Sequence, residues 1–284
     1  MRRISLLAGH LNTSRLGFGT SSLHHLRSAR ERAALLHHCF SRGLRHFDTA
    51  PLYGHEMAER ELGRFIRERR SEVIVATKFG IQPNRWFARS PALLYAGMAI
   101  QYAAGRSGLI PVRPRRKDFS KQQMTRSLER SLRNLQSDYV DLYLAHEPTE
   151  DFGQFSEELV HELLRIREAG KARYLGFAGG AGHCLALARR YPTVADVLQI
   201  EAEASSRKSN CVHDATLDRQ ITFGCFRAAL KGAIGSARLG IIRHCAERAA
   251  LENPNGVILF SARTATRIDE ILSVFRLVEG VAAI

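Results

Sequence analysis

Short apolar runs alternate with amphipathic segments along this chain. The apolar runs, several rich in β-branched residues, predict strands at 16–20, 45–48, 73–78, 140–146, 172–177, 197–200, 221–226 and 257–260. Apolar positions at helical spacing predict helices near 28–42, 56–69, 120–136, 154–169, 182–190, 237–251 and 264–278. Strands that alternate with helices form parallel sheets. Eight such units in 284 residues favour a closed (β/α)8 barrel, the TIM barrel, over an open doubly wound sheet.

Two segments add to this alternation. Residues 1–12 predict an N-terminal β-hairpin, and residues 79–119 form a long insertion after the third barrel strand, within one expected barrel domain over 1–284. The insertion holds Trp86, the only tryptophan, and an apolar stretch at 91–100 that predicts its own helix. It leaves the barrel at the face where the strands end. Two interpretations stay open: a lid or pocket wall, and a surface elaboration.

Cysteine usage and hydropathy indicate the compartment. The five cysteines are odd in number and form no CxxC pair, which predicts reduced thiols and argues against structural zinc. The histidine pairs at 24–25 and 37–38 lack the spacing of a metal site, so no metal is expected. No apolar run approaches the ~18 residues that span a bilayer. We therefore expect a cytoplasmic protein without a membrane partner.

The net charge of +14 raises the question of a polyanionic partner. The basic residues are spread along the chain, and their only cluster, at 113–117, has no interleaved aromatic residues. Nucleic acid is therefore not expected as a partner, although binding of a polyanion to the basic surface stays a weaker alternative. The same charge would attract a phosphorylated cofactor or an acidic substrate.

Four ionisable residues stand at or just after the ends of three consecutive predicted strands. They are Asp48, Tyr53, Lys78 and His146. Each alone has an ordinary structural explanation, such as a packed tyrosine in a turn or an aspartate that caps a helix. In a parallel α/β barrel, however, all strand carboxyl ends emerge on the face that carries the chemistry. We therefore expect the four side chains to meet there.

These residues lie in segments through which the chain resembles the aldo-keto reductase family. The matching segments are LGFGT, RHFDTAPLYG, AERELGRFI, VIVATKFG, SLERSLRNLQSDYVDLYLAHEP, GKARYLGF and SARTATRIDEIL. They follow the family order over nearly the whole chain. The resemblance implies an NADP(H)-dependent oxidoreductase that interconverts a carbonyl (an aldehyde, ketone or sugar) and an alcohol by hydride transfer.

The resemblance also assigns chemical roles to the four residues. Tyr53 is the general acid in reduction and the base in oxidation, and His146 orients the substrate oxygen. Free tyrosine, with a pKa of ~10, is a weak acid at neutral pH. An ammonium ~4 Å away stabilises the phenolate by up to ~4 kcal/mol, nearly 3 pKa units. We therefore expect Lys78, held by Asp48, to bring the pKa of Tyr53 toward neutral.

The cofactor-binding positions implied by the resemblance are only partly kept. The positions assigned to the cofactor are Gly19, Thr20, Asp48 and Gln199 near the nicotinamide, and Arg263, Arg267 and Glu270 near the 2′-phosphate and adenine. Ser261, also near the 2′-phosphate, occupies a position that often holds Lys or Gly in the family. A Ser-Asn pair that holds the carboxamide in the family is replaced by Ala178 and Gly179. Gly224 stands where an aromatic residue often stacks on the ring. Arg263 and Arg267 are alternatively solvated residues at a helix start.

The missing Ser-Asn pair motivates a second function. A catalytically weak barrel of this family would act as a binding or regulatory protein that responds to nicotinamide nucleotides. The sequence does not identify the substrate or the oligomeric state.

Overall fold

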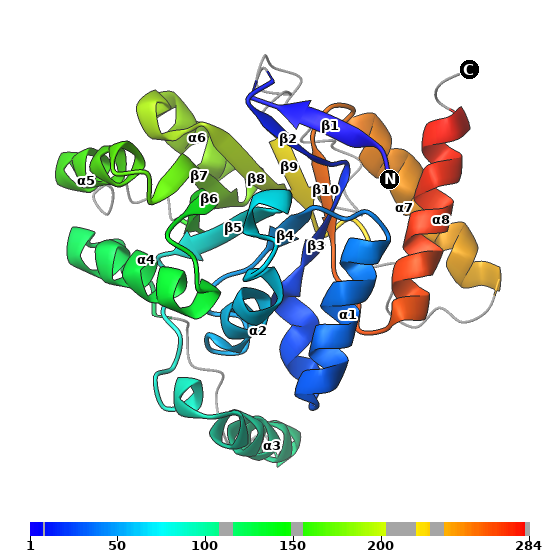
Figure 1. Cartoon of the computed structure of the whole chain (residues 1–284), viewed down its shortest axis with the longest axis horizontal. Helices are drawn as coiled ribbons and strands as arrows, with labels where there is room; N and C mark the ends of the chain where they lie inside the picture. Colours follow the sequence, from blue (N-terminus) through cyan, green and yellow to red (C-terminus); the bar gives the residue numbers. More distant parts are fainter. Residues whose placement is uncertain (8, 108–115, 149–155, 203–219, 228–235, 282–284) are drawn as a thin grey trace.

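The core of the computed structural model is a closed barrel of parallel strands. The structure describes residues 1–7, 9–107, 116–148, 156–202, 220–227 and 236–281. The barrel strands follow one another around the barrel in chain order, and β10 closes it by pairing with β3. They are β3 (Leu16–Gly19), β4 (His46–Asp48), β5 (Ile74–Phe79), β6 (Val140–His146), β7 (Ala172–Gly179), β8 (Val197–Glu201), β9 (Gln220–Phe223) and β10 (Val257–Phe260). The predicted TIM barrel is confirmed (Figure 1).

Helices follow most of the strands and cover the outside of the barrel. They are α1 (Ala29–Ser41), α2 (Met57–Ile66), α4 (Lys121–Leu135), α5 (Glu157–Glu168), α6 (Ala181–Arg190), α7 (Ser236–Glu252) and α8 (Ala265–Val281). Serine hydroxyls cap two of them: Ser120 accepts from Gln123 N–H, and Ser156 accepts from Leu159 N–H. The stretch between 202 and 220, which the sequence leaves without a clear pattern, lies almost wholly outside the described residues.

The N-terminal hairpin closes one end of the barrel. Strands β1 (Arg3–Leu6) and β2 (Leu11–Ser14) pair antiparallel directly before β3, as predicted. Their apolar side chains pack in one buried cluster with residues of the barrel strands, including Leu142 and Leu259. The hairpin therefore covers the end where strands begin, and the end where strands finish stays available for a site.

Two predicted elements end three residues earlier than expected. The strand predicted over 221–226 stops at Phe223, because Gly224 adopts a left-handed φ of 89° that breaks the extended backbone. The helix predicted to reach residue 69 ends at Ile66, and the chain makes a short 3₁₀ turn at Arg70–Glu72.

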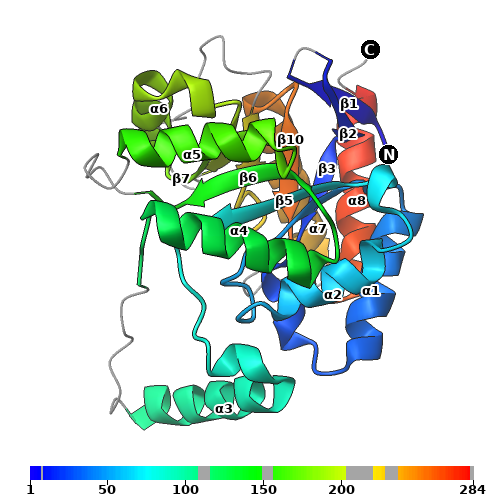
Figure 2. The ribbon, with the colours of Figure 1, turned by 60° about the vertical axis from the view of Figure 1, so that its left-hand side comes forward.

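The insertion after β5 contains the predicted helix. A 3₁₀ turn, η3 (Phe87–Arg89), leads into α3 (Pro91–Ser107), and residues 108–115 lie outside the described part of the chain. Figures 1 and 2 show α3 outside the ring of helices, beyond α2 and α4 and away from the strands. Among the described residues, no helix is long and apolar enough to cross a membrane.

One titratable side chain is enclosed in the barrel below the strand ends. His46 lies two residues before Asp48 on β4 and is fully buried. Residues two apart on a strand face the same side, so His46 faces the barrel interior as Asp48 does. Burial, together with the charge of Lys78, lowers the pKa of His46 to about 3. Neither ring nitrogen has a partner among the described residues.

His46 therefore predicts a loss of stability in acid. In the unfolded chain the imidazole binds a proton near pH 6.5, whereas in the folded protein it stays neutral down to about pH 3. The unfolded state thus binds more protons in this window, so stability is intact above pH 6.5 and falls by up to about 4–5 kcal/mol toward pH 3. In urea unfolding at neutral pH and near pH 4, we expect His46→Leu to reduce this loss.

The exposed His161 on α5 supplies the control, and His161→Leu should leave the pH dependence of unfolding unchanged. An equal acid sensitivity of His46→Leu and the parent protein would show that His46 is not the group responsible.

Candidate active site

The carboxyl ends of β4, β5 and β6 bring the predicted residues to one rim of the barrel. Asp48 ends β4 and His146 ends β6, while Lys78 is the second-last residue of β5. In the sheet register Asp48 pairs with Gly19 on one side, and His146 pairs with Ala178 on the other. Positions far apart in sequence are therefore neighbours across the strand ends.

Lys78 is the central contact of this rim. Its Nζ lies 2.5 Å from Oδ1 of Asp48, 3.1 Å from the carbonyl oxygen of Thr49 and 3.4 Å from Oη of Tyr53. Each of the three ammonium hydrogens thus has an acceptor. Lys78 is 1% exposed and Asp48 3% exposed, so the pair is enclosed. The ammonium is fixed in position next to the phenol.

Burial dominates the proton affinities at the site. Burial by itself would lower the pKa of Lys78, but the charges of Asp48 and Tyr53 outweigh it and raise the pKa, so Lys78 stays charged. Burial raises the pKa of Tyr53 above its ordinary value, and the charge of Lys78 offsets this rise only in part. The expected near-neutral tyrosine is therefore wrong for the protein as it stands: at neutral pH, Tyr53 carries its proton.

Tyr53 stands on a tight left-handed turn. Gly54, His55 and Glu56 have φ values of 56°, 49° and 73°. A side chain at Gly54 would collide with His24. Non-glycine residues pay ~1–2 kcal/mol each for this conformation, and such strain tends to gather at functional sites. The backbone N–H of Glu56 donates to the carbonyl of Pro51 at 2.7 Å and closes the turn.

The end of the turn is held by charge. The buried carboxylate of Glu56 accepts from Arg60 and from Arg130, each at 3.1 Å. Arg130 lies on α4, so the turn is tied to the helix that precedes β6.

His146 faces the same tyrosine. Its ring lies edge-on to the ring of Tyr53, with centroids 6.0 Å apart, and it is 9% exposed. The next residue, Glu147, has a φ of 48°, and its N–H donates to the carbonyl of Ala178 at 2.6 Å. This turn ends β6 directly after the imidazole. The structure therefore brings all four predicted residues together around the phenol of Tyr53.

The insertion contacts the loops on both sides of the site. The backbone N–H of Asn84 donates to Nδ1 of His55 at 3.0 Å, and Phe87 packs 5.3 Å from the His55 ring. At the other end, Nζ of Lys117 donates to the carbonyl of Glu147 at 2.7 Å. Sequence reasoning did not single out His55 or Lys117 as parts of the site. The sequence did contain one signal for these contacts: the insertion leaves β5, which lies between β4 and β6, the strands whose following turns hold His55 and Glu147.

The residues expected at the nicotinamide lie on neighbouring strand ends. Gln199 on β8 is buried, and its Oε1 has no partner among the described residues. Burial raises the pKa of Asp48, and the charge of Lys78 with hydrogen bonds from Lys78 and Gln199 offsets part of this rise. The hydroxyl of Thr20 donates to the Asp48 carbonyl at 3.0 Å, and that of Ser261 donates to the Gly19 carbonyl at 2.7 Å. A buried amide oxygen without a described partner, beside the rim that holds Lys78 and Tyr53, fits an incoming N–H donor such as a carboxamide.

The residues expected at the phosphate and adenine lie at the start of α8. Nη1 of Arg267 is buried and has no partner among the described residues, so it is available to an anion. Glu270 is engaged: Arg238 of α7 donates to its Oε1 at 2.5 Å, and Nε of Arg267 lies 3.4 Å from its Oε2. Arg263 is exposed, and its charge helps to lower the pKa of His24 to about 4, after burial and the neighbouring histidines.

The residues that depart from the family pattern, Ala178, Gly179 and Gly224, lie at or just after the ends of β7 and β9. Ala178 is buried at the end of β7, and neither it nor Gly179 offers a side-chain hydrogen bond. Of the phenylalanines that flank Gly224, Phe226 is buried in the hydrophobic core, whereas Phe223 is partly exposed at the end of β9.

In the part of the chain that the structure describes, no group of three or more His, Cys, Asp or Glu side chains is arranged to hold a metal ion. His38, from one of the histidine pairs, instead lies 3.0 Å from Asp269 of α8.

Comparisons with known proteins agree with this geometry. The chain is 29% identical over 178 residues to the L-galactose dehydrogenase of Arabidopsis thaliana, which is 60% of this chain and 46% of that protein. It is 26% identical over 238 residues to the NADP(+) aldo-keto reductase yakc of Schizosaccharomyces pombe, which is 78% of this chain and 60% of that protein. The matches thus span about half the length of these curated relatives.

The fold also recurs in solved structures. The holo form of an aldo-keto reductase from Bacillus halodurans superposes with a TM-score of 0.72 at 18% identity, over 96% of this chain and 90% of that one. The model of the aldo/keto reductase family matches residues 15–228, well over half of the 284 residues. This protein therefore belongs to the aldo/keto reductase family.

Proposed function

We propose that this protein is an NADP(H)-dependent oxidoreductase that interconverts a carbonyl and an alcohol by hydride transfer, with Tyr53 as general acid and base. The observation that supports it most is the placement of Lys78 between Asp48 and Tyr53, 2.5 Å and 3.4 Å away, at the strand ends beside His146. A lysine without a role in the site would ordinarily be exposed to solvent, whereas Lys78 is buried. A buried ammonium against a phenol is suited to proton transfer at that phenol.

The bound cofactor supplies the hydride, and the residues of this chain supply the proton. As the substrate oxygen gains negative charge, Tyr53 donates its proton to it and becomes a phenolate. Lys78, 3.4 Å from Oη, stabilises that phenolate by roughly 4–5 kcal/mol at an effective dielectric of about 20. His146 donates a hydrogen bond to the same oxygen and fixes its angle.

The raised pKa of Tyr53 fits this order of events. Burial keeps the proton on the phenol before the reaction, and the attraction to Lys78 grows only as the phenolate forms. Stabilisation that appears in the transition state and not in the ground state is the kind that speeds a reaction. Asp48 keeps Lys78 charged and in place for both states.

NADP(H) is the cofactor that the free polar atoms favour. Gln199 Oε1 would accept from the nicotinamide carboxamide, and Thr20, Gly19 and Ser261 lie on the adjoining strand ends. Nη1 of Arg267 would hold the 2′-phosphate, with Arg263 adding positive charge. Arginine binds phosphate with charge-assisted hydrogen bonds, which favours NADP(H) over NAD(H). Glu270, beside Arg267, is the proposed adenine contact.

The substrate class proposed is a small aldehyde, ketone or sugar. The named activity of the plant relative, on L-galactose, supports a sugar as the first compound to test. A second candidate function is a nucleotide-responsive binding protein with weak turnover. It is motivated by Ala178 and Gly179, which give the carboxamide no side-chain partner. NADPH binding without oxidation across aldehydes, ketones and sugars would favour this second candidate.

Replacing Tyr53 by phenylalanine tests the proton donor. We expect Tyr53→Phe to reduce kcat by at least about 10²–10⁴-fold, because general acid catalysis is lost. The affinity for NADPH, measured by fluorescence titration, should stay unchanged because no cofactor contact is proposed for the hydroxyl. Tyr174→Phe is the matched control, since its hydroxyl contacts the His10 carbonyl away from the site. Normal turnover by Tyr53→Phe would refute the role assigned to it.

The buried ion pair links activity to stability. Lys78→Met leaves the Asp48 carboxylate buried without its cation, which should lower the free energy of unfolding by about 3–5 kcal/mol. Adding Asp48→Asn removes the unpaired charge and should restore part of that stability without restoring turnover. Chemical denaturation and steady-state rates measure the two effects. Recovery of turnover in the double variant would contradict the role of Lys78.

Arg267 tests the choice of cofactor. We expect Arg267→Leu to weaken NADPH binding by about 10–100-fold, since a hydrogen bond to a charged group contributes about 1.5–3 kcal/mol. NADH lacks the 2′-phosphate, so its affinity should stay unchanged. Arg276→Leu, an exposed arginine on the same helix, is the control. Equal losses for both nucleotides would place the phosphate elsewhere.

A further inference from the structure

The charge of the insertion after β5 is one-sided. Residues 79–119 contain seven Lys and Arg residues and one acidic residue, Asp118, so they contribute +6 of the net +14 of the chain. Within them, residues 90–105 carry no charged side chain at all. The insertion therefore joins an uncharged helical stretch to flanking cations.

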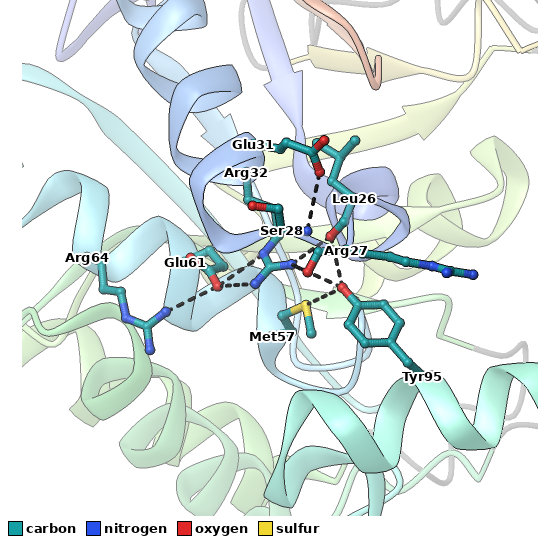
Figure 3. A network of polar contacts seen from close by, with 9 residues as sticks. All are labelled: Leu26, Arg27, Ser28, Glu31, Arg32, Met57, Glu61, Arg64 and Tyr95. Atoms are coloured by element: carbon teal, nitrogen blue, oxygen red, sulfur yellow. Dashed lines mark hydrogen bonds and ion pairs between the residues drawn. The ribbon is translucent and has the colours of Figure 1, made fainter.

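One side of α3 is fixed to the barrel. Leu94 is 3% exposed, and a side chain at Gly97 would collide with the Phe87 ring, which packs there. Oη of Tyr95 donates to the Leu26 carbonyl at 2.8 Å and accepts from Nη1 of Arg32 at 3.0 Å (Figure 3).

The same anchor continues into α2. Arg32 in turn pairs with the buried carboxylate of Glu61 at 2.8 Å. Sδ of Met57 lies 3.9 Å from Oη of Tyr95. Figure 3 shows the side chains of Arg32, from α1, and Met57, from α2, directed toward the hydroxyl of Tyr95. This side of α3 is thus a built junction, which fixes how the opposite side is presented.

The opposite side of α3 is apolar and uncovered. Leu93, Ala96 and Ile100 recur at helical spacing and are exposed, with Leu93 at 43% and Ile100 at 64%. Trp86, just before η3, is 67% exposed, and the guanidinium of Arg89 lies 4.7 Å from its ring. We call these five residues the insertion surface. Large exposed apolar side chains gathered on one element mark a site of interaction.

We propose that the insertion surface binds the face of an anionic lipid bilayer, with α3 lying in the interface. Helices that lie in an interface combine an apolar face, an aromatic side chain and arginines that meet anionic headgroups. Basic segments beside such a face add attraction to anionic lipid that falls with salt. The insertion has each of these features. The sequence expectation of no membrane partner rests on the absence of a spanning segment, which an interfacial helix does not need.

Other occupants fit the charge less well. A second copy of the chain would bring two insertions, each with a net charge of +6 and a single carboxylate, against one another. Nucleic acid would match the cations but leave Leu93 and Ile100 uncovered. An anionic bilayer satisfies both the apolar and the basic part of the surface.

Vesicle binding tests the proposal without any nucleotide or substrate, so its outcome is separate from that of the proposed activity. The full chain is sedimented with vesicles of phosphatidylglycerol and phosphatidylcholine, and with vesicles of phosphatidylcholine alone. We expect binding to the anionic vesicles only, weakened by salt. Trp86 is the only tryptophan, and its emission should move to shorter wavelength on binding.

A matched pair of double variants locates the contact. Leu93→Glu with Ile100→Glu should weaken vesicle binding by at least about tenfold, because two apolar anchors are lost and acid is added. Leu251→Glu with Leu277→Glu makes the same charge change at positions 81% and 69% exposed on α7 and α8, and should bind as the parent does. Circular dichroism and thermal unfolding check that both variants fold.

Three results would overturn the proposal. They are no binding to anionic vesicles, equal binding by the two double variants, and an unshifted Trp86 emission while the protein sediments. Sedimentation velocity adds a fourth. A dimer that is lost in Leu93→Glu with Ile100→Glu would show that a second copy covers this surface.

Discussion

The enclosure of Lys78 is the constraint on which the site depends. A buried ammonium is tolerated only when it is paired and hydrogen-bonded, and here Asp48, the Thr49 carbonyl and Tyr53 supply the three acceptors. These partners come from β4 and from the turn that follows it, so the position of β5 against β4 and the shape of the turn are fixed together. The phenol of Tyr53 is held in place because its oxygen is one of the acceptors of the Lys78 ammonium.

The same enclosure explains why the resting tyrosine keeps its proton. Burial disfavours any new charge, and the neighbouring cation, Lys78, is already shared with a carboxylate. In the proposed reaction, Lys78 therefore acts chiefly on the phenolate formed during reduction. In this account burial keeps the proton on Tyr53 before the reaction, and Lys78 stabilises the negative charge on the phenolate after the proton has left.

Much of this arrangement was predictable from the sequence, because strand ends in a parallel barrel share one face. Asp48, Lys78 and His146 followed from the ends of the predicted strands, and Tyr53 from its place just after the strand at 45–48. The family resemblance added their chemical roles. The pKa of Tyr53 was predicted in the wrong direction, because sequence gives the charge of a neighbour but not the degree of burial. The contact of His55 with Asn84 and the pairing of Arg238 with Glu270 join segments whose relative placement no local pattern records.

The insertion shows both what a local sequence pattern predicts and what it does not. Its helix follows from the apolar stretch at 91–100, yet the side that faces the barrel depends on Tyr95 meeting Arg32, a contact between residues far apart in sequence. Its two ends touch the turns after Tyr53 and His146, so this segment adjoins the site while its helix stands outside the barrel (Figure 2).

The most direct test of the account is the pH dependence of a single turnover of NADPH oxidation with a reactive aldehyde. If Tyr53 holds its proton through burial and donates it in the reaction, the rate of reduction should stay level through neutral pH. It should fall only in alkali, above the ordinary tyrosine pKa of about 10. A rate that falls with a midpoint near neutral pH, or one that Tyr53→Phe reproduces unchanged, would contradict the account.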